Sequence, residues 1–246
     1  MEDRAQTLVR KMVTNIYYPH PASIIDVKEE TPDIKTFTLS FKDEEIHNRF
    51  TFRPGQFVLL SVLHCGEAPI SICSPPTFSK GLELSIKKMG RLTGEVHRYS
   101  KGDEAGLRGP YGNGFPLEEL CGHDLLFVGG GIGLAPLRSL VEYVLSNRSD
   151  FGEVTVLYGA RTPADLVFRD DLAAWAGKED LNVMITVDRG DSEWKGEIGP
   201  VTHLWKKATI YPSTTKAIIC GPPVMISFVV SDLLKMGFNE DDIITT

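Results

Sequence analysis

The chain has 246 residues, of which 42% are apolar, so it is long enough for one large or two ordinary domains with a sizeable core. Its formal net charge of −7 argues against nucleic acid as the main partner, because that partner would need a basic face. No apolar run approaches the roughly 20 residues needed to span a bilayer, and residues 1–13 lack the apolar core of a signal peptide. We therefore expect a cytoplasmic protein.

The first part of the chain reads as a β domain that follows a short extension. Residues 1–16 have a helical pattern and form an N-terminal extension that ends at Tyr17–Pro21. From residue 17 to residue 120, alternating stretches separated by turn residues predict a small closed antiparallel β-barrel. The expected strands are Ser23–Val27, Ile34–Leu39, Gln56–Val62 and Leu82–Lys87.

The sequence pattern of residues 121–246 differs from that of the barrel and predicts an α/β domain. Apolar runs alternate here with helical patterns, as in a parallel sheet with crossover helices. The expected strands are Leu125–Val128, Val154–Tyr158, Val183–Val187 and Ala217–Cys220. The expected helices are Pro136–Ser146, Phe168–Ala176, Val201–Trp205 and Pro223–Met236.

The clearest local motif is the glycine loop that follows the first of these strands. It consists of Gly129, Gly130, Gly131, Ile132 and Gly133. Pro136 suits the first turn of the next helix, where its missing N–H costs nothing. A strand, a glycine loop and a helix start together predict a phosphate site. The alternative is that the glycines serve only a tight turn with close helix–strand packing.

Two further strand ends carry small or special residues, Gly159-Ala160-Arg161 and Cys220-Gly221-Pro222-Pro223. Ligands of open parallel sheets lie beyond the carboxyl ends of the strands, so three loops there predict a binding site. The other cysteines, Cys65, Cys73 and Cys121, are widely spaced and predict neither a zinc nor an iron–sulfur site. We expect them to be small buried residues.

Six motifs occur in register along the chain. They are Arg53–Phe57, Pro69–Ile72, Gly90–Thr93, Gly109–Phe115, the glycine loop with Tyr158–Arg161, and Cys220–Met225. From about Asn15 onwards this order resembles the ferredoxin–NADP reductase superfamily, a β-barrel that binds FAD followed by a Rossmann-like domain that binds NAD(P). More narrowly, it resembles the flavin subunits of dihydroorotate dehydrogenase B, anaerobic sulfite reductase and NAD(P)-linked sulfhydrogenases.

The resemblance implies that FAD binds to the barrel. The residues implied to lie along the flavin edge are Pro69, Ile70, Ser71 and Ile72, with the Ser71 hydroxyl near N5. Ile86 and Lys87 would line the cofactor, while Gly90, Leu92 and Thr93 would open a helix that holds the pyrophosphate. The residues themselves agree, since Thr93 is a suitable cap for a helix that starts at Gly94.

The motif Ala68-Pro69-Ile70-Ser71 departs from the Arg-x-Tyr-Ser of many relatives. It lacks both the arginine that pairs with a phosphate and the tyrosine that stacks on the ring. Lys87, Lys88 or Arg91 could supply the missing charge. The choice of FAD over FMN therefore rests on the resemblance.

The resemblance also implies a nicotinamide site on the α/β domain. The glycine loop would face the pyrophosphate, and Gly159, Ala160 and Arg161 would lie along the adenosine half. Arg161 could meet a 2′-phosphate or could pair with Asp165 or Asp170, so NAD versus NADP stays open. The residues implied against the nicotinamide are Cys220, Gly221, Pro222 and Met225, although Cys220 could equally be a buried strand cysteine.

The implied reaction is hydride transfer between nicotinamide and flavin, with Ser71 and Cys220 beside the reacting atoms and no resident metal. Single electrons would then pass to an iron–sulfur subunit of a hetero-oligomeric reductase or hydrogenase. Relatives of this type carry a cysteine-rich tail that holds a [2Fe–2S] cluster, which this sequence does not contain. Either the sequence is cut before such a tail, which the ending Ile243–Thr246 inside an apparent strand favours, or the protein passes electrons straight to another subunit. The alternative function is a non-catalytic docking or regulatory subunit with a reductase-like fold.

Overall fold

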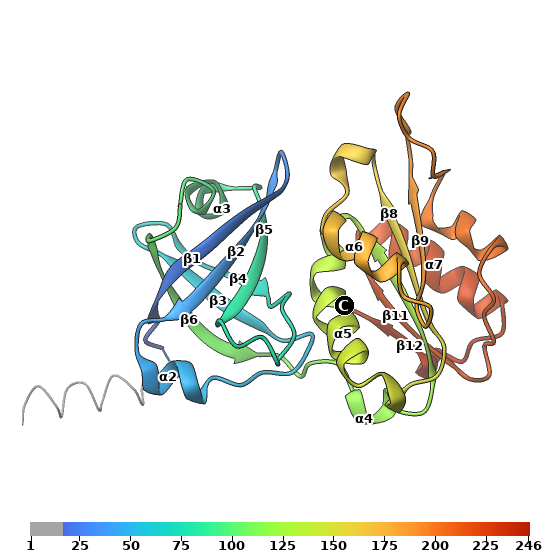
Figure 1. The fold of residues 1–246 in the computed structure, drawn as a ribbon, viewed down its shortest axis with the longest axis horizontal. Coiled ribbons are helices and arrows are strands. Elements are labelled where there is room, and N and C mark those ends of the chain that lie inside the picture. Colours follow the sequence, from blue (N-terminus) through green and yellow to red (C-terminus); the bar gives the residue numbers. More distant parts are fainter. Residues whose placement is uncertain (1–16) are drawn as a thin grey trace, which may run out of the picture.

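The computed structural model describes residues 17–246, which form a barrel of strands beside an α/β half (Figure 1). The extension expected at residues 1–16 lies outside the described residues. The domain boundary predicted at residue 120 falls at the end of helix α4 (Leu117–Leu120), between the two sheets, and stays a prediction. Among the described residues no helix is long and apolar enough to cross a membrane.

The first sheet has six antiparallel strands in the order β4-β3-β6-β1-β2-β5. Their bounds are β1 His20–Thr31, β2 Ile34–Phe41, β3 Phe57–Val62, β4 Gly66–Ser71, β5 Leu82–Lys87 and β6 Glu104–Tyr111. The outer strands β4 and β5 meet where Ile72 bridges to Leu84, and the Cys73 N–H donates to the Glu83 carbonyl at 2.9 Å. This contact closes the sheet, which confirms the predicted barrel.

Alternation along the strands builds the barrel core. In β3, Val58, Leu60 and Val62 are buried while the residues between them are half-exposed. Leu60 lies opposite Leu107 of β6, so apolar side chains from neighbouring strands meet inside. The barrel is therefore filled by side chains, and any large ligand has to bind on its outside.

In the described part of the chain, the barrel carries the short helices α2 (Glu44–Arg49) and α3 (Arg91–Val96). The predicted start of α3 after Thr93 is wrong, because Gly90 caps the helix and Thr93 lies in its first turn. The Thr93 hydroxyl instead accepts the N–H groups of Met89 and Gly90, both at 2.9 Å. The hydroxyl therefore stabilises the turn that precedes the helix.

The second sheet has six parallel strands in the order β10-β9-β8-β7-β11-β12, which confirms the predicted α/β fold. Their bounds are β7 Asp124–Gly130, β8 Val154–Ala160, β9 Asn182–Val187, β10 Glu197–Ile198, β11 Thr215–Cys220 and β12 Ile243–Thr245. The chain winds outward from β7 in one direction and then returns to the other side of β7 through β11. The carboxyl ends of β7 and β11 therefore form the switch point of the sheet.

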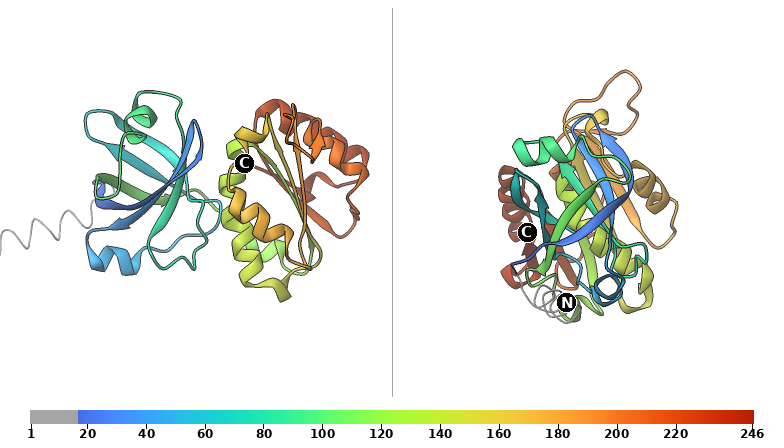
Figure 2. Two further views of the ribbon diagram at one scale, coloured as in Figure 1. Left: turned by 45° about the horizontal axis from the view of Figure 1, so that its top comes forward. Right: turned by 90° about the vertical axis from the view of Figure 1, so that its left-hand side faces the viewer.

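Helices cover both faces of this sheet. On the side facing the barrel lie α5 (Leu134–Ser146) and α6 (Arg169–Ala176), and on the far side lie η4 (Val201–Lys206) and α7 (Pro223–Lys235) (Figures 1 and 2). Short 3₁₀ turns complete the half: η1 Gly131–Gly133, η2 Arg148–Asp150, η3 Pro163–Asp165 and η5 Glu240–Asp242. The expected helix at residues 201–205 is thus a 3₁₀ helix, and α5 starts two residues before Pro136.

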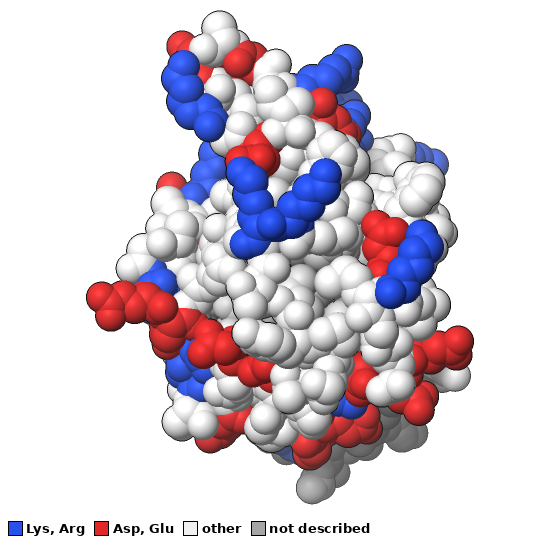
Figure 3. All heavy atoms as spheres, turned by 90° about the vertical axis from the view of Figure 1, so that its right-hand side faces the viewer, with Lys and Arg blue, Asp and Glu red and all other residues white. Residues whose placement is uncertain are grey.

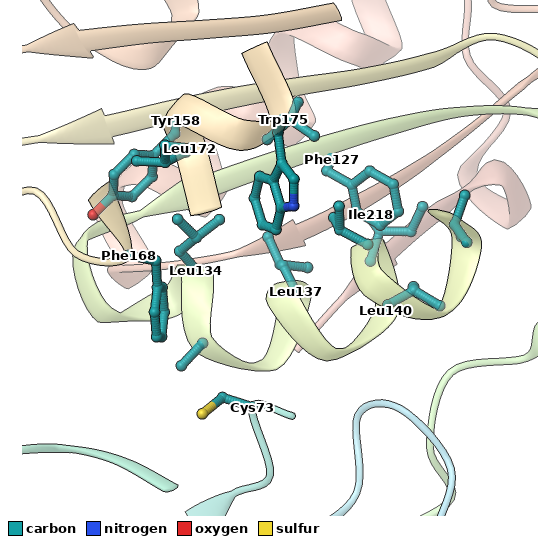
Figure 4. Close-up of a cluster of buried hydrophobic side chains, with 14 of the residues drawn as sticks. Cys73, Phe127, Leu134, Leu137, Leu140, Tyr158, Phe168, Leu172, Trp175 and Ile218 are labelled. Atoms are coloured by element: carbon teal, nitrogen blue, oxygen red, sulfur yellow. The ribbon is translucent and has the colours of Figure 1, made fainter. Parts of the chain in front are cut away.

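The main core of the α/β half lies between the sheet and helices α5 and α6 (Figure 4). Two barrel residues, Ile34 and Cys73, belong to this same buried cluster. A second cluster lies between the sheet and α7. The outer face of this half has a central area without Lys, Arg, Asp or Glu, with Lys and Arg above it and Asp and Glu gathered towards the lower margin (Figure 3).

Candidate functional site

The glycine loop connects β7 to α5 at the switch point. Gly129 and Gly130 end the strand, Gly131–Gly133 form the 3₁₀ turn η1, and the helix follows at Leu134. Gly131 has a φ of +54°, and a Cβ built on it would meet nothing within 4 Å. No side chain caps α5, and its first turn holds no acidic residue. The corner at Gly131 is therefore open and has no negative charge in the turn that follows.

Two other glycines of the loop serve close packing. A Cβ on Gly133 would lie 2.4 Å from the backbone oxygen of Cys220, and one on Gly130 would lie 2.4 Å from the Met225 sulfur. The loop after β7 thus contacts the loop after β11 with backbone against backbone. The packing role considered for the glycines holds at these two positions, whereas at Gly131 no neighbouring atom requires a glycine.

Cys220 ends β11 with its Cα opposite that of Gly129 in the sheet register. Burial raises the pKa of its thiol to about 11, so the thiol is neutral at pH 7. Gly221 and Pro222 follow, and α7 begins at Pro223. A Cβ on Gly221 would lie 2.5 Å from the Met225 methyl group, which can move, and 3.2 Å from the Cα of Gly130, so the two loops also approach closely here.

Arg161 follows β8 and is largely exposed. Its guanidinium donates to the Asp165 carboxylate at 2.7 Å, which is one of the two pairings expected for it. The other expected partner, Asp170, pairs instead with Lys28 of the barrel. Ala160 accepts the N–H of Asp188 at 2.9 Å, so the ends of β8 and β9 stay together. A contact of Arg161 with a 2′-phosphate stays a prediction.

Tyr158 is a residue of this region whose role the sequence did not reveal. It is fully buried on β8, and its hydroxyl donates to the Gly131 carbonyl at 3.2 Å. The same hydroxyl accepts the Val167 N–H at 3.3 Å. Burial raises the pKa of Tyr158, so the hydroxyl keeps its proton. It therefore ties the open corner of the glycine loop to the segment before α6.

On the barrel, the predicted flavin edge occupies the end of β4. Ser71 lies opposite Phe57 of β3, and within residues 17–246 its half-buried hydroxyl makes no hydrogen bond. Pro69 is exposed and Ile70 is half-buried. Ile72 and Ile86 are buried in the barrel core, so their side chains do not line a surface site.

The basic residues proposed to replace the missing arginine have different partners. Lys87 lies 3.4 Å from the Asp33 carboxylate, and Arg91 donates to the His64 carbonyl at 3.0 Å. Lys88 is exposed. All three therefore stay alternatives for the charge that the missing arginine would supply.

The cysteines differ from one another in burial. Cys73 is buried as expected and Cys65 is half-buried. Cys121 is exposed, contrary to expectation, because it follows the short helix α4, in which only Leu120 is buried. Within residues 17–246, no group of three or more His, Cys, Asp or Glu is arranged to hold a metal ion.

Comparison with known proteins identifies the family. Residues 127–231 match the model of the oxidoreductase NAD-binding domain. Over 245 residues the chain is 38% identical to sulfhydrogenase 2 subunit gamma of Pyrococcus furiosus, covering 94% of this chain and 84% of that protein. A solved ferredoxin NADP+ reductase of Neisseria gonorrhoeae, with bound FAD and NADP, is 25% identical with a TM-score of 0.75, covering 92% of this chain and 97% of that one. The chain belongs to the ferredoxin–NADP reductase family.

Within the ferredoxin–NADP reductase family, the chain is also similar to a probable electron transfer subunit of dihydroorotate dehydrogenase B (NAD(+)) from Methanothermobacter thermautotrophicus. That protein is 36% identical over 208 residues, covering 85% of this chain and 70% of the relative. The chain is accordingly an oxidoreductase of a family that binds FAD and NAD(P). The predicted family and fold class are confirmed, and the roles of individual site residues stay predictions.

Proposed function

We propose that this chain is an FAD-containing NAD(P)H oxidoreductase subunit. It transfers hydride between a nicotinamide cofactor and flavin, and passes single electrons to an iron–sulfur centre or another partner subunit. The observation that carries this proposal is the open corner at Gly131, which lies at the start of α5 and at the switch point of the parallel sheet. A pyrophosphate fits there because a helix start favours an anion and the first turn has no acidic residue.

The residues at the three strand ends fit a dinucleotide. The glycine loop would hold the pyrophosphate, while Gly159, Ala160 and Arg161 would lie along the adenosine half. Cys220, Gly221 and Pro222 would meet the nicotinamide. The neutral thiol of Cys220 suits a neighbour of the ring that takes no part in bond making, because the thiolate and not the thiol is the nucleophile.

The barrel residues fit a flavin along the end of β4. The Ser71 hydroxyl makes no hydrogen bond within residues 17–246, so it can donate to or accept from a ligand. Pro69 and Ile70 would flank it. The turn before α3, with Gly90, Leu92 and Thr93, would meet the FAD pyrophosphate. Lys87, the last residue of β5, would add a positive charge.

The bound cofactors supply hydride transfer and the release of electrons one at a time. This chain contributes binding, orientation and the exclusion of water. No general acid or base is needed for hydride transfer. The buried Tyr158 and the half-buried Cys220 both remain protonated at neutral pH, because burial raises the pKa of each. Tyr158 fixes the glycine loop through the Gly131 carbonyl, and Ser71 orients the flavin edge.

The partner is proposed from the relatives. Both similar archaeal proteins are named as subunits, one of a sulfhydrogenase and one of a dihydroorotate dehydrogenase. We therefore infer that this chain works in a hetero-oligomer. That the partner is an iron–sulfur subunit, and that a [2Fe–2S] cluster takes part in the electron transfer, is proposed from the family resemblance of the sequence.

Anaerobic titration of the FAD-loaded protein with NADH and with NADPH tests the proposed function. We expect the flavin absorbance near 450 nm to bleach with about one equivalent of the preferred nucleotide, because one hydride reduces one flavin. The measurement also decides between NAD and NADP. Protein that binds FAD but is bleached by neither nucleotide would favour the rival function, a docking or regulatory subunit.

The substitution Ser71→Ala tests the barrel side. We expect flavin content to be unchanged and the first-order rate constant of flavin reduction to fall about fivefold, since one hydrogen bond at the flavin edge is worth about 1 kcal/mol. Stopped-flow absorbance at saturating nucleotide measures this constant. Ser71→Thr keeps the hydroxyl and should retain most of the rate. Equal rates in Ser71→Ala and the unsubstituted protein would remove Ser71 from the mechanism.

A further inference from the structure

The two halves of the molecule are joined by a buried arginine, Arg138 of α5. Its Nη1 donates to the Glu83 carboxylate at 2.6 Å and to the Cys73 carbonyl at 3.1 Å, and both acceptors belong to the barrel. Its Nε donates to the Asp171 carboxylate of α6 at 2.7 Å. The Arg138 side chain is only 14% exposed. A single guanidinium thus links the barrel to two helices of the α/β half.

The groups around Arg138 stabilise its positive charge and fix the orientation of its guanidinium. The guanidinium lies 5.0 Å from the centre of the Phe168 ring, and the side chains of Glu83 and Asp171 are 16% and 26% exposed. Burial acts to lower the pKa of Arg138, but the neighbouring Cys73, Asp171 and Glu83 together outweigh burial and raise this pKa above its ordinary value. The planar fork of an arginine can hold acceptors in set directions, which a lysine cannot do.

A second buried contact lies beside the first. The Ser139 hydroxyl donates to the Ser74 carbonyl at 2.6 Å, and both residues are fully buried. Consecutive residues of α5 therefore hold consecutive residues of the barrel, Cys73 and Ser74. Figure 4 shows Cys73 facing α5 from the barrel side, with Phe168 next to the same helix.

A third contact joins the halves at the start of α6. The Glu30 carboxylate of β1 accepts the Phe168 N–H at 3.0 Å and the Thr36 hydroxyl at 3.0 Å. The Glu30 side chain is only 3% exposed. Phe168 has a φ of +53°, an uncommon conformation for a bulky residue that the surroundings must hold. The junction is therefore made of buried, specific polar contacts.

These contacts are close in sequence to both proposed cofactor sites. Cys73 follows Ser71 by two residues, and Arg138 follows Gly133 by five residues along the same loop and helix. A shift of the barrel against α5 would therefore move the end of β4 relative to the glycine loop. A misplacement of about 1 Å between reacting groups can lower a rate by about 10²-fold.

We propose that Arg138 is a positioning residue that holds the end of β4 against α5 through Glu83 and Cys73, and so sets how the flavin and nicotinamide sites meet. This inference rests on the proposed function. Arg138 touches neither reacting centre in this role and acts through the backbone that carries Ser71 and the glycine loop.

Two matched substitutions separate this role from general stabilisation. Glu83→Ala removes the carboxylate across the junction, and Asp171→Ala removes the carboxylate within the α/β half; each leaves Arg138 with one carboxylate. With FAD-loaded protein, we expect Glu83→Ala to lower the rate constant of flavin reduction at saturating nucleotide at least tenfold. Its flavin content and nucleotide Kd should be unchanged, and Asp171→Ala should change the rate constant less than threefold. Equal rate constants in the two variants would overturn the proposal.

A measurement without nucleotide tests the junction itself. We expect small-angle X-ray scattering to give a larger radius of gyration for Glu83→Ala than for Asp171→Ala, because only the first variant loosens the two halves. Identical scattering of the two variants would contradict the proposal. If neither nucleotide reduces the flavin of the unsubstituted protein, the proposed function fails, while the scattering comparison still decides whether Arg138 and Glu83 hold the halves together.

Discussion

The substitution Gly131→Asp should weaken nucleotide binding by roughly 30- to 150-fold while leaving flavin content unchanged. The new carboxylate would stand in the open corner, beside the proposed pyrophosphate, where repulsion between like charges is worth about 2–3 kcal/mol. The backbone tolerates the change, because aspartate is among the few residues that accept a φ of +54°. Titration of the flavin-loaded protein with oxidised nucleotide, followed by the change in flavin absorbance, gives the Kd.

Gly131→Asn is the matched control for this charge effect. Asparagine has nearly the same size and also accepts the left-handed conformation, but it carries no charge. We expect its Kd to lie within about threefold of the unsubstituted value, which is less than 1 kcal/mol. If aspartate and asparagine weaken binding equally, steric contact and not charge is responsible. Unchanged affinity in both variants would place the pyrophosphate elsewhere.

Gly133→Ala should lower the free energy of unfolding by about 1–3 kcal/mol, the usual cost of forcing extra atoms into close packing. The new Cβ would lie 2.4 Å from the Cys220 oxygen and 2.6 Å from its carbonyl carbon, and neither backbone atom can move alone. The end of β11 would have to shift away from the glycine loop. We therefore also expect weaker nucleotide binding, because the two strand ends form one site. Urea unfolding followed by fluorescence measures the stability change.

Gly94→Ala is the control for Gly133→Ala. Gly94 lies in α3, and a Cβ there would meet nothing within 4 Å. Alanine is a better helix former than glycine, so stability should stay the same or rise by up to about 1 kcal/mol. Equal losses in the two variants would show that the contact at Gly133 does not carry the effect.

The core of the α/β half was predictable from the sequence because its central strands β7 and β8 are buried on both faces. Runs such as Leu125–Val128 are continuously apolar, and each is followed by a turn and a helical pattern. In the barrel, β4 and β6 were not predicted as strands. Pro69 interrupts β4, and glycine and proline occur together in β6 at Gly109–Pro110, so neither segment has the propensity or the alternation of a strand.

The open corner of the glycine loop was predictable from the sequence, whereas the Arg138 junction between the two halves was not. The glycine loop has a local pattern of strand, glycines and helix that marks a helix start. Arg138, by contrast, lies within an ordinary amphipathic helix, and its partner Glu83 is 55 residues earlier in the chain. Tyr158 likewise meets Gly131 across 27 residues. Single-sequence patterns contain no signal for such contacts, since only the packed structure brings these side chains together.

Ile34 and Cys73 of the barrel belong to the hydrophobic cluster of the α/β half. This shared core affects how the barrel can be combined with a different α/β half. Within residues 17–246 the polypeptide passes from one sheet to the other only once, yet the apolar interior does not divide at that crossing. A chimaera that grafts this barrel onto another nucleotide-binding half would have to repack both residues against a foreign helix. Recombination between relatives at this boundary therefore requires compatible junction surfaces as well as a shared linker.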